Sequence, residues 1–296
     1  MGKISNTIAD LEAGRRTPKD VATSVLTTGV AVGFLLVLLF PVYWIVAASL
    51  SKGTTLSSPG GLFGDPFAYT LDSFVWVLEN EDFRRGLLNS LIVVSVTVIV
   101  TLAFSIPGAY ALSRREFLGR RKILYGYILF TQMGAGLSIA VLIALYALFS
   151  NVGLANNLLV LGVFYGAGAI PFNTWLLKTF MDNIPVSYEE AALIDGASQW
   201  QVIREVILPL SKPGIAAVLV FAWTAGWNEF IVAQTLIYDP ELYPLSVELY
   251  GLVGDRDTNW SQFAAFALLF ALPVALIYFL AQKQVESGLS FGGMEG

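Results

Sequence analysis

Three carboxylates and a glycine lie within a short polar stretch between two strongly apolar parts of the chain. They are Glu189, Glu190, Asp195 and Gly196, with Ala191, Ala192 and Ala197 among them. Carboxylates in the first turn of a helix are stabilised by its positive end. The chemistry that these residues predict is helix capping and a polar contact with a partner, because a chain this apolar rarely keeps such a stretch without one.

Two capping patterns predict how the stretch folds. Ser187 is followed three residues later by Glu190, and Ser198 is followed three residues later by Gln201. Each pair has the spacing of a capping box, in which the serine and the longer side chain satisfy each other's backbone N–H groups. We therefore expect one short helix over about residues 188–194 and a second helix starting after Ser198.

Between these helices, Asp195-Gly196 predicts a sharp turn, because glycine adopts the positive φ that ends a helix. Leu208-Pro209 and then Pro213 mark the entry into the next apolar run. Two short helices joined at a glycine form a projection that can enter a groove on a partner. An amphipathic connector lying on the bilayer surface would show a similar pattern, so the residues alone leave both interpretations open.

The residue inventory argues against an enzyme. The chain has no histidine and no cysteine, which removes the usual general base, the thiolate nucleophile and the commonest metal ligands. It also lacks the glycine-rich phosphate loop that ends in Gly-Lys-Ser/Thr. We expect no metal and no cofactor on this chain, and any ATP hydrolysis to take place on another subunit.

Glu229 is a carboxylate inside an apolar run, where a charge costs about 2–3 kcal/mol and usually faces a cavity or a partner helix. It is a candidate for a solute pathway, or a hydrogen-bonded structural residue beside Trp227 and Asn228. Other polar residues of the apolar runs either line the same route or tie helices together. These further pathway candidates are Gln132, Ser138, Asn173 and Asn228.

The composition is that of a membrane protein. Apolar residues make up 56% of the chain and charged residues 13%, and the mean hydropathy is +0.68. A helix needs about 20 mainly apolar residues to cross the hydrocarbon core. Reading the runs between charges and turn signals predicts six transmembrane helices in an all-α polytopic protein. The predicted crossings lie within residues 21–51, 86–113, 123–149, 158–180, 213–238 and 258–282.

The Lys and Arg residues predict the orientation, because cytoplasmic loops carry the excess of them. With the N-terminus inside, only Lys52, Arg84, Arg85 and Arg256 lie outside. Both termini are then cytoplasmic. The layout is a tail (1–20), a membrane domain (21–283) and a second tail (284–296). The cytoplasmic loop 181–212 holds the polar stretch, and the large external loops are 51–85 and 239–260.

A resemblance to a known family sharpens this interpretation. Glu190-Ala191-Ala192, Asp195-Gly196-Ala197 and Leu208-Pro209-Leu210 resemble the EAA motif in the coupling loop of permease subunits of binding-protein-dependent ABC importers. Further segments resemble the smaller of the two permeases in maltose-type carbohydrate importers. They are Gln132-Met133, Leu145–Phe149, Trp227-Asn228-Glu229-Phe230 and the tail Gly288–Gly293.

The resemblance implies a MetI-like permease fold and a set of partners. Two permeases pair in the membrane, a soluble extracytoplasmic binding protein delivers the solute, and an ATPase homodimer that binds ATP and Mg²⁺ docks on the coupling loops. Membrane lipid surrounds the assembly, and no nucleic acid is involved. In this chain the coupling residues would be Glu189, Glu190, Ala191, Ala192, Asp195, Gly196, Ala197, Leu208 and Pro209.

The net charge of -5 and the acidic outer loops favour a neutral solute, because their field repels anions. We expect a carbohydrate, in the plasma membrane of a prokaryote, with the acidic surface typical of a halophilic archaeon. One alternative is a permease for another small neutral solute or a polyol. An alternative from another class is an ion-coupled secondary transporter that uses Glu229.

Overall fold

The computed structural model describes residues 18–52, 69–133, 139–253 and 258–291. These residues form helices, and the β-type pairing found among them is one isolated bridge between Ser51 and Tyr69. The longer helices are α2 (Pro18–Ser49), α4 (Glu81–Arg114), α5 (Arg120–Met133), α6 (Ile139–Asn151), α7 (Leu158–Asp182), α11 (Lys212–Trp227) and α14 (Trp260–Phe291). The shorter ones are α3 (Asp72–Glu79), α8 (Ser187–Ile194), α9 (Gln199–Gln201), η2 (Val202–Ile207), α10 (Leu208–Leu210), α12 (Ile231–Leu236), η3 (Pro240–Leu242) and α13 (Leu245–Gly251). The all-α membrane fold predicted from composition is confirmed.

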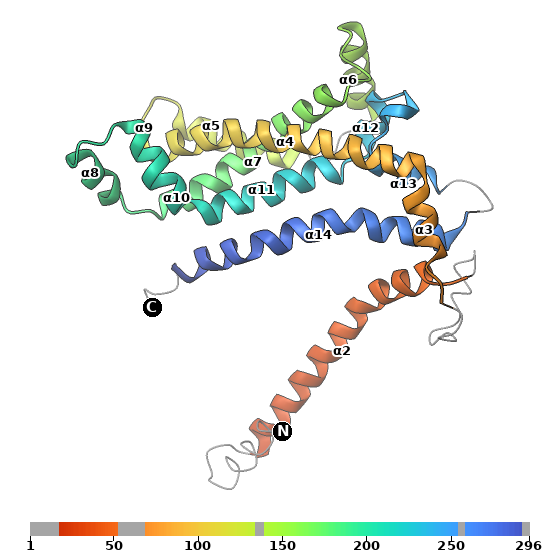
Figure 1. Ribbon diagram of the computed structural model, residues 1–296. Coiled ribbons are helices and arrows are strands. Elements are labelled where there is room, and N and C mark those ends of the chain that lie inside the picture. Colours follow the sequence, from red (N-terminus) through yellow and green to blue (C-terminus); the bar gives the residue numbers. More distant parts are fainter. Residues whose placement is uncertain (1–17, 53–68, 134–138, 254–257, 292–296) are drawn as a thin grey trace.

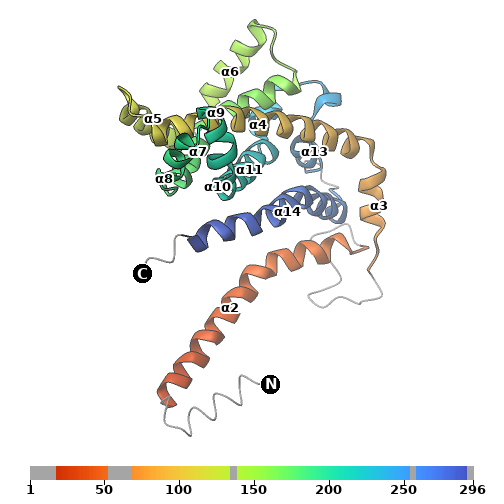
Figure 2. The same ribbon diagram turned by 60° about the vertical axis from the view of Figure 1, so that its left-hand side comes forward.

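Helices α4, α7, α11 and α14 run side by side and form the body of the molecule, whereas the N-terminal half of α2 extends away from it (Figures 1 and 2). Four segments within the described residues are single helices long and apolar enough to cross a membrane. They are Thr23–Ser49, Glu81–Arg114, Leu158–Asp182 and Trp260–Gln284. Each covers most of a predicted crossing.

The other two predicted crossings differ from single helices. The crossing predicted over residues 123–149 corresponds to α5 and α6, with residues 134–138 outside the described residues. The crossing predicted over 213–238 is divided, because α11 ends at Trp227 and α12 starts at Ile231. The segment before α11, Gln199–Leu210, meets it at a bend of 75°.

Small residues set the packing of α4 on α7. A Cβ atom on Gly162 would lie 2.7 Å from Val96 Cβ, and one on Gly166 would lie 2.8 Å from Val100 Cβ. The hydroxyls of Thr97 and Thr101 on α4 donate to the carbonyls of Gly162 (3.1 Å) and Gly166 (3.3 Å). Close approach of small residues and hydroxyl hydrogen bonds between helices are the interactions that hold membrane bundles together.

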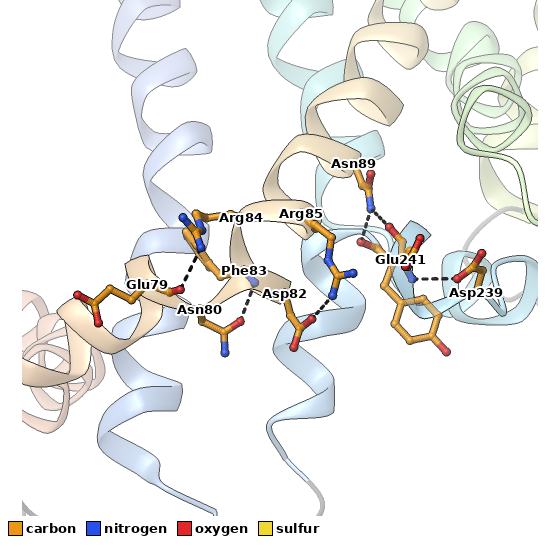
Figure 3. Close-up of polar contacts among 10 residues, drawn as sticks. Glu79, Asn80, Asp82, Phe83, Arg84, Arg85, Asn89, Asp239 and Glu241 are labelled. Carbon is orange, nitrogen blue, oxygen red and sulfur yellow. Dashed lines mark hydrogen bonds and ion pairs between the residues drawn. The ribbon is translucent and has the colours of Figure 1, made fainter.

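The two ends of the bundle carry different structures. Helices α8 and α9 lie at one end, and α3, α12 and α13 lie at the other (Figure 1). At this second end, the amide of Asn89 on α4 donates to the carbonyls of Glu241 (2.9 Å) and Tyr243 (3.1 Å), as Figure 3 shows. The hydroxyl of Ser90 accepts the N–H of Leu245 at 2.7 Å. The loop between α12 and α13 is thus fastened to the start of α4.

Candidate functional site

The coupling segment, residues 187–211, links α7 to α11 and contains α8, α9, η2 and α10. The turn after α8 is made by Gly196, whose φ is +88°. The N–H of Gly196 donates to Leu193 O at 3.1 Å, and the N–H of Ala197 donates to Ala192 O at 3.0 Å. This left-handed glycine with its paired bonds closes the helix end. The predicted glycine turn between two short helices is confirmed.

One of the two predicted capping boxes forms. The N–H of Ser198 donates to Gln201 Oε1 at 2.8 Å, and the N–H of Gln201 donates back to Ser198 Oγ at 3.4 Å. The box predicted for Ser187 and Glu190 is wrong, because Ser187 is already inside α8 and the residue before it, Val186, caps without a side-chain bond. The backbone turns helical at Val186, whose carbonyl accepts the Glu189 N–H at 2.9 Å.

A π-helix, η2, follows the second box. It ends immediately before Leu208-Pro209, and proline has no N–H to donate and clashes with the carbonyl four residues earlier. The wider π-turn accommodates that break within a continuous helical path. Pro209 is exposed and Leu208 is half-buried. The segment then bends into α11.

The motif residues point in two directions. Glu190, Ala191, Asp195 and Gly196 are exposed, as are Leu193 and Ile194, the latter with 85% of its surface accessible. Ala192 and Ala197 instead pack against a buried cluster that includes Leu177, Met181 and Ile207. The segment therefore has one exposed face, and its other face rests on the bundle.

Glu189 belongs to the inner face, unlike its neighbour Glu190. Its side chain is 10% exposed and forms an ion pair with Arg114, which is 9% exposed. The hydroxyl of Tyr110 donates to the second carboxylate oxygen at 3.3 Å. The sequence prediction grouped Glu189 with the exposed coupling residues, and it gave Arg114 no role beyond its positive charge. The only sequence signal for Arg114 was its place in the pair of arginines, Arg114 and Arg115, where α4 ends.

Glu229 lies at the break between α11 and α12. Its carboxylate accepts the N–H groups of Val232 (3.0 Å) and Ala233 (3.2 Å), and the hydroxyl of Tyr165 on α7 donates to it. A carboxylate that accepts the first N–H groups of a helix stabilises the start of that helix. Glu229 is thus placed as a cap that joins α7 to α12.

Three of the other pathway candidates lie among the described residues, at different places in the fold. Asn228 is exposed at the end of α11. Asn173 is buried in α7, and its amide donates to Ala169 O at 2.8 Å. Gln132 lies in α5 near its end, and Ser138 falls outside the described residues.

The sequence prediction missed an aromatic groove between α5 and α7. It encloses about 230 Å³ and is lined by Tyr127, Ile128, Thr131, Phe172 and Trp175. Phe172 also meets Phe221 of α11 edge to face at 5.1 Å. Pockets for small organic ligands are lined mainly by apolar and aromatic side chains, but usually hold about 300–1,000 Å³. The groove is therefore smaller than most such pockets.

Comparisons with known proteins agree with this geometry. The galactooligosaccharides transport system permease protein GanQ of Bacillus subtilis is 35% identical over 264 residues, which cover 88% of this chain and 91% of GanQ. The maltose/maltodextrin transport system permease protein MalG of Salmonella typhimurium is 33% identical over 279 residues, covering 89% and 93% of the two chains.

A solved bacterial ABC transporter involved in the import of the acidic polysaccharide alginate contains a similar chain. It is 25% identical with a TM-score of 0.76, covering 90% of this chain and 98% of that one. A family model described as "Binding-protein-dependent transport system inner membrane component" matches residues 105–291, which include the coupling segment and Glu229. This chain belongs to the family of binding-protein-dependent transport system inner membrane components.

Proposed function

We propose that this chain is a permease subunit of an ATP-driven importer and that its solute is a carbohydrate. The observation that carries the proposal is the coupling segment: a two-helix projection, turned by Gly196, whose exposed face holds Glu190, Ala191 and Asp195. A face of this kind fits a groove on another protein. Its position at the end of the bundle opposite the fastened outer loop suits transmission of force from one side of the membrane.

The proposed partners are an ATPase homodimer that carries ATP and Mg²⁺, a second permease, and an extracytoplasmic binding protein. The family description supports the binding protein. The groove of Tyr127, Phe172 and Trp175 is too small to enclose an oligosaccharide by itself. This supports a second permease, which would supply another wall. The ATPase would receive the exposed face of the coupling segment.

The proposed solute is a neutral oligosaccharide. The names of GanQ and MalG refer to galactooligosaccharides and to maltose and maltodextrin. Carboxylates at the outer end of the bundle, among them Asp82, Glu241 and Glu248, disfavour anionic solutes through their field. The alginate importer, which is involved in the import of an acidic polysaccharide, supplies the anionic solute for comparison in the uptake test.

Glu229 gives no support to the ion-coupled alternative. Its carboxylate is engaged with the N–H groups of α12 and with Tyr165. We place the chain in the plasma membrane of a prokaryote with both termini cytoplasmic, and the net charge of -5 favours a halophilic archaeon.

The test is co-purification from native membranes of the tagged chain and of its Gly196→Pro variant. Proline fixes φ near −65°, so the variant cannot form the turn at +88°. We expect the unchanged chain to bring down an ATPase and a second permease, and the variant to recover at least tenfold less ATPase. Gly153→Pro, at another positive-φ glycine (+68°) in the turn between α6 and α7, is the matched control.

Uptake by the reconstituted complex then identifies the solute. Labelled maltodextrin and galactooligosaccharide are expected to enter in an ATP-dependent way, and alginate oligosaccharide is not. Recovery of the chain without an ATPase, or uptake driven by an ion gradient alone, would refute the proposal.

A further inference from the structure

The end of α4 is joined to the coupling segment by side chains far apart in sequence. Arg114 donates to the carboxylate of Glu189 on α8 and, at 2.8 Å, to the carbonyl of Ile184 in the preceding turn. Next to it, Ser113 donates to Asp182 at 2.6 Å, and Arg115 donates to Gln199 of α9. The end of α4 and the residue that follows it therefore contact the end of α7, α8 and α9. Helices α8 and α9 lie on either side of the Gly196 turn.

The Arg114–Glu189 pair is the buried centre of this contact. Both carboxylate oxygens of Glu189 have partners on α4, because Tyr110 donates to the one that Arg114 does not. Removing one member of a buried ion pair leaves an uncompensated charge, so such a pair holds its two elements in one geometry. The neighbouring Glu190, by contrast, is exposed.

Apolar contacts also join the coupling segment to α4 and α7. Ala192 and Ala197 of the coupling segment rest on a cluster that contains Ala109 of α4 and Met181 of α7. The inner face of α8 is thus joined through Glu189 to α4, which runs the length of the bundle (Figure 1).

We propose that Glu189 is a positioning residue, which acts through Arg114 to make α8 and α4 move as one rigid body. This inference rests on the proposed function. Within it, Glu190 makes the contact to the ATPase and Glu189 transfers the resulting movement to the transmembrane helices. Loss of the pair uncouples ATP hydrolysis from solute movement and leaves ATPase docking in place.

The experiment measures solute imported per ATP hydrolysed by the reconstituted complex. Glu189→Gln is expected to lower this ratio at least tenfold while ATPase recovery stays within twofold of the unchanged chain. The exchanged pair Arg114→Glu with Glu189→Arg is expected to restore the ratio to within threefold. Glu116→Gln, at an exposed carboxylate just after α4, serves as the control and should leave the ratio unchanged.

An unchanged ratio in Glu189→Gln would overturn the inference, and so would a loss of ATPase recovery as large as that in Glu190→Gln. Neither result touches the proposed function, which fails if the unchanged chain recovers no ATPase or if uptake is driven by an ion gradient alone.

A second measurement leaves the Arg114–Glu189 pair intact, so it does not depend on how well the variants of that pair fold. The chain contains no cysteine, so spin labels can be placed on it at Val186→Cys, next to α8, and Ile99→Cys, on α4, both at exposed positions. A rigid link predicts the same label distance without nucleotide and with ATP. A change of more than about 5 Å, roughly one helical turn, would refute it.

Discussion

Glu189 and Glu190 show how adjacent residues of one type acquire different roles. Successive residues of a helix point about 100° apart, so only one of the pair faces α4. The sequence predicts a charged helix start from these two residues, but it does not reveal which one is inward. The partner, Arg114, lies 75 residues earlier in the chain, and only the packing of α8 against α4 brings the two together.

At Glu229 we expect the acceptor oxygen to matter more than the charge. Glu229→Gln retains an oxygen for the N–H groups of α12 and should lower the stability of the purified complex by less than about 1 kcal/mol. Glu229→Ala removes the acceptor and leaves Tyr165 without its partner, which should cost about 1–3 kcal/mol. Thermal unfolding in detergent measures both. A larger loss in the glutamine variant would instead assign the role to the charge.

At the scale of the helices, long apolar runs were predicted well because hydrophobicity and length are local properties of the chain. The four single membrane helices and the Gly196 turn follow from them and from glycine chemistry. The division between α11 and α12 did not, because the apolar run from Pro213 continues past it and Glu229 acts there as a tertiary cap. The aromatic groove was also missed, because it is formed by the packing of α5 against α7, which no local pattern reveals.

The contact between α4 and α7 should be sensitive to a single methyl group. Gly166→Ala places a Cβ 2.8 Å from Val100 Cβ and 3.0 Å from the Thr97 carbonyl oxygen, atoms that move only with the backbone. We expect a loss of about 1–3 kcal/mol, seen as a lower melting temperature. Gly168→Ala, on the same helix with nothing within 4 Å of the new atom, is the control and should be neutral or slightly stabilising.

The docking of α13 on α4 should depend on pH. Burial, followed by the charge of Asp82 and partly offset by Arg85, raises the pKa of Glu248 from 4.5 to about 7. The folded state therefore binds this proton more tightly than the unfolded state does. The stabilisation is complete below pH 4.5 and is lost as the pH rises through 7.

Because Glu248 is only half-buried, we expect an effect on the order of 1 kcal/mol. Melting temperature measured from pH 5 to pH 8 should fall in the unchanged chain, and Glu248→Gln should remove that slope. Glu241→Gln, at an exposed carboxylate of the neighbouring loop, should keep it. An identical slope in both variants would contradict the assignment.

For the whole molecule, the Lys and Arg bias predicts that the coupling segment lies inside and the loop between α12 and α13 lies outside. The structure puts these two regions at opposite ends of the bundle (Figure 1). This is required if they lie on opposite sides of the membrane. The EAA motif implies the class of partner by resemblance, whereas the choice of an individual partner depends on surfaces that are complete only in the assembly.

Orientation can be tested with single cysteines in this cysteine-free chain. Tyr238→Cys, at an exposed outer position, should react with an impermeant maleimide in intact cells. Leu118→Cys, fully exposed between α4 and α5, should react only after permeabilisation. Mass-shift labelling of both variants before and after permeabilisation checks this, and the reverse pattern would invert the topology.

The π-helix η2 sets a condition for exchanging parts between permeases. Each of its i→i+5 hydrogen bonds spans one more residue than the i→i+4 bond of a regular α-helix, so the π-turn inserts an extra residue between the Gly196 bend and Pro209. Deleting a single residue there would rotate the residues that follow, in α10 and α11, by about 100° relative to α8. A chimaera that borrows this region has to take it whole, from Ser187 to Ser211, since a graft that matches only the motif would join the right residues in the wrong phase.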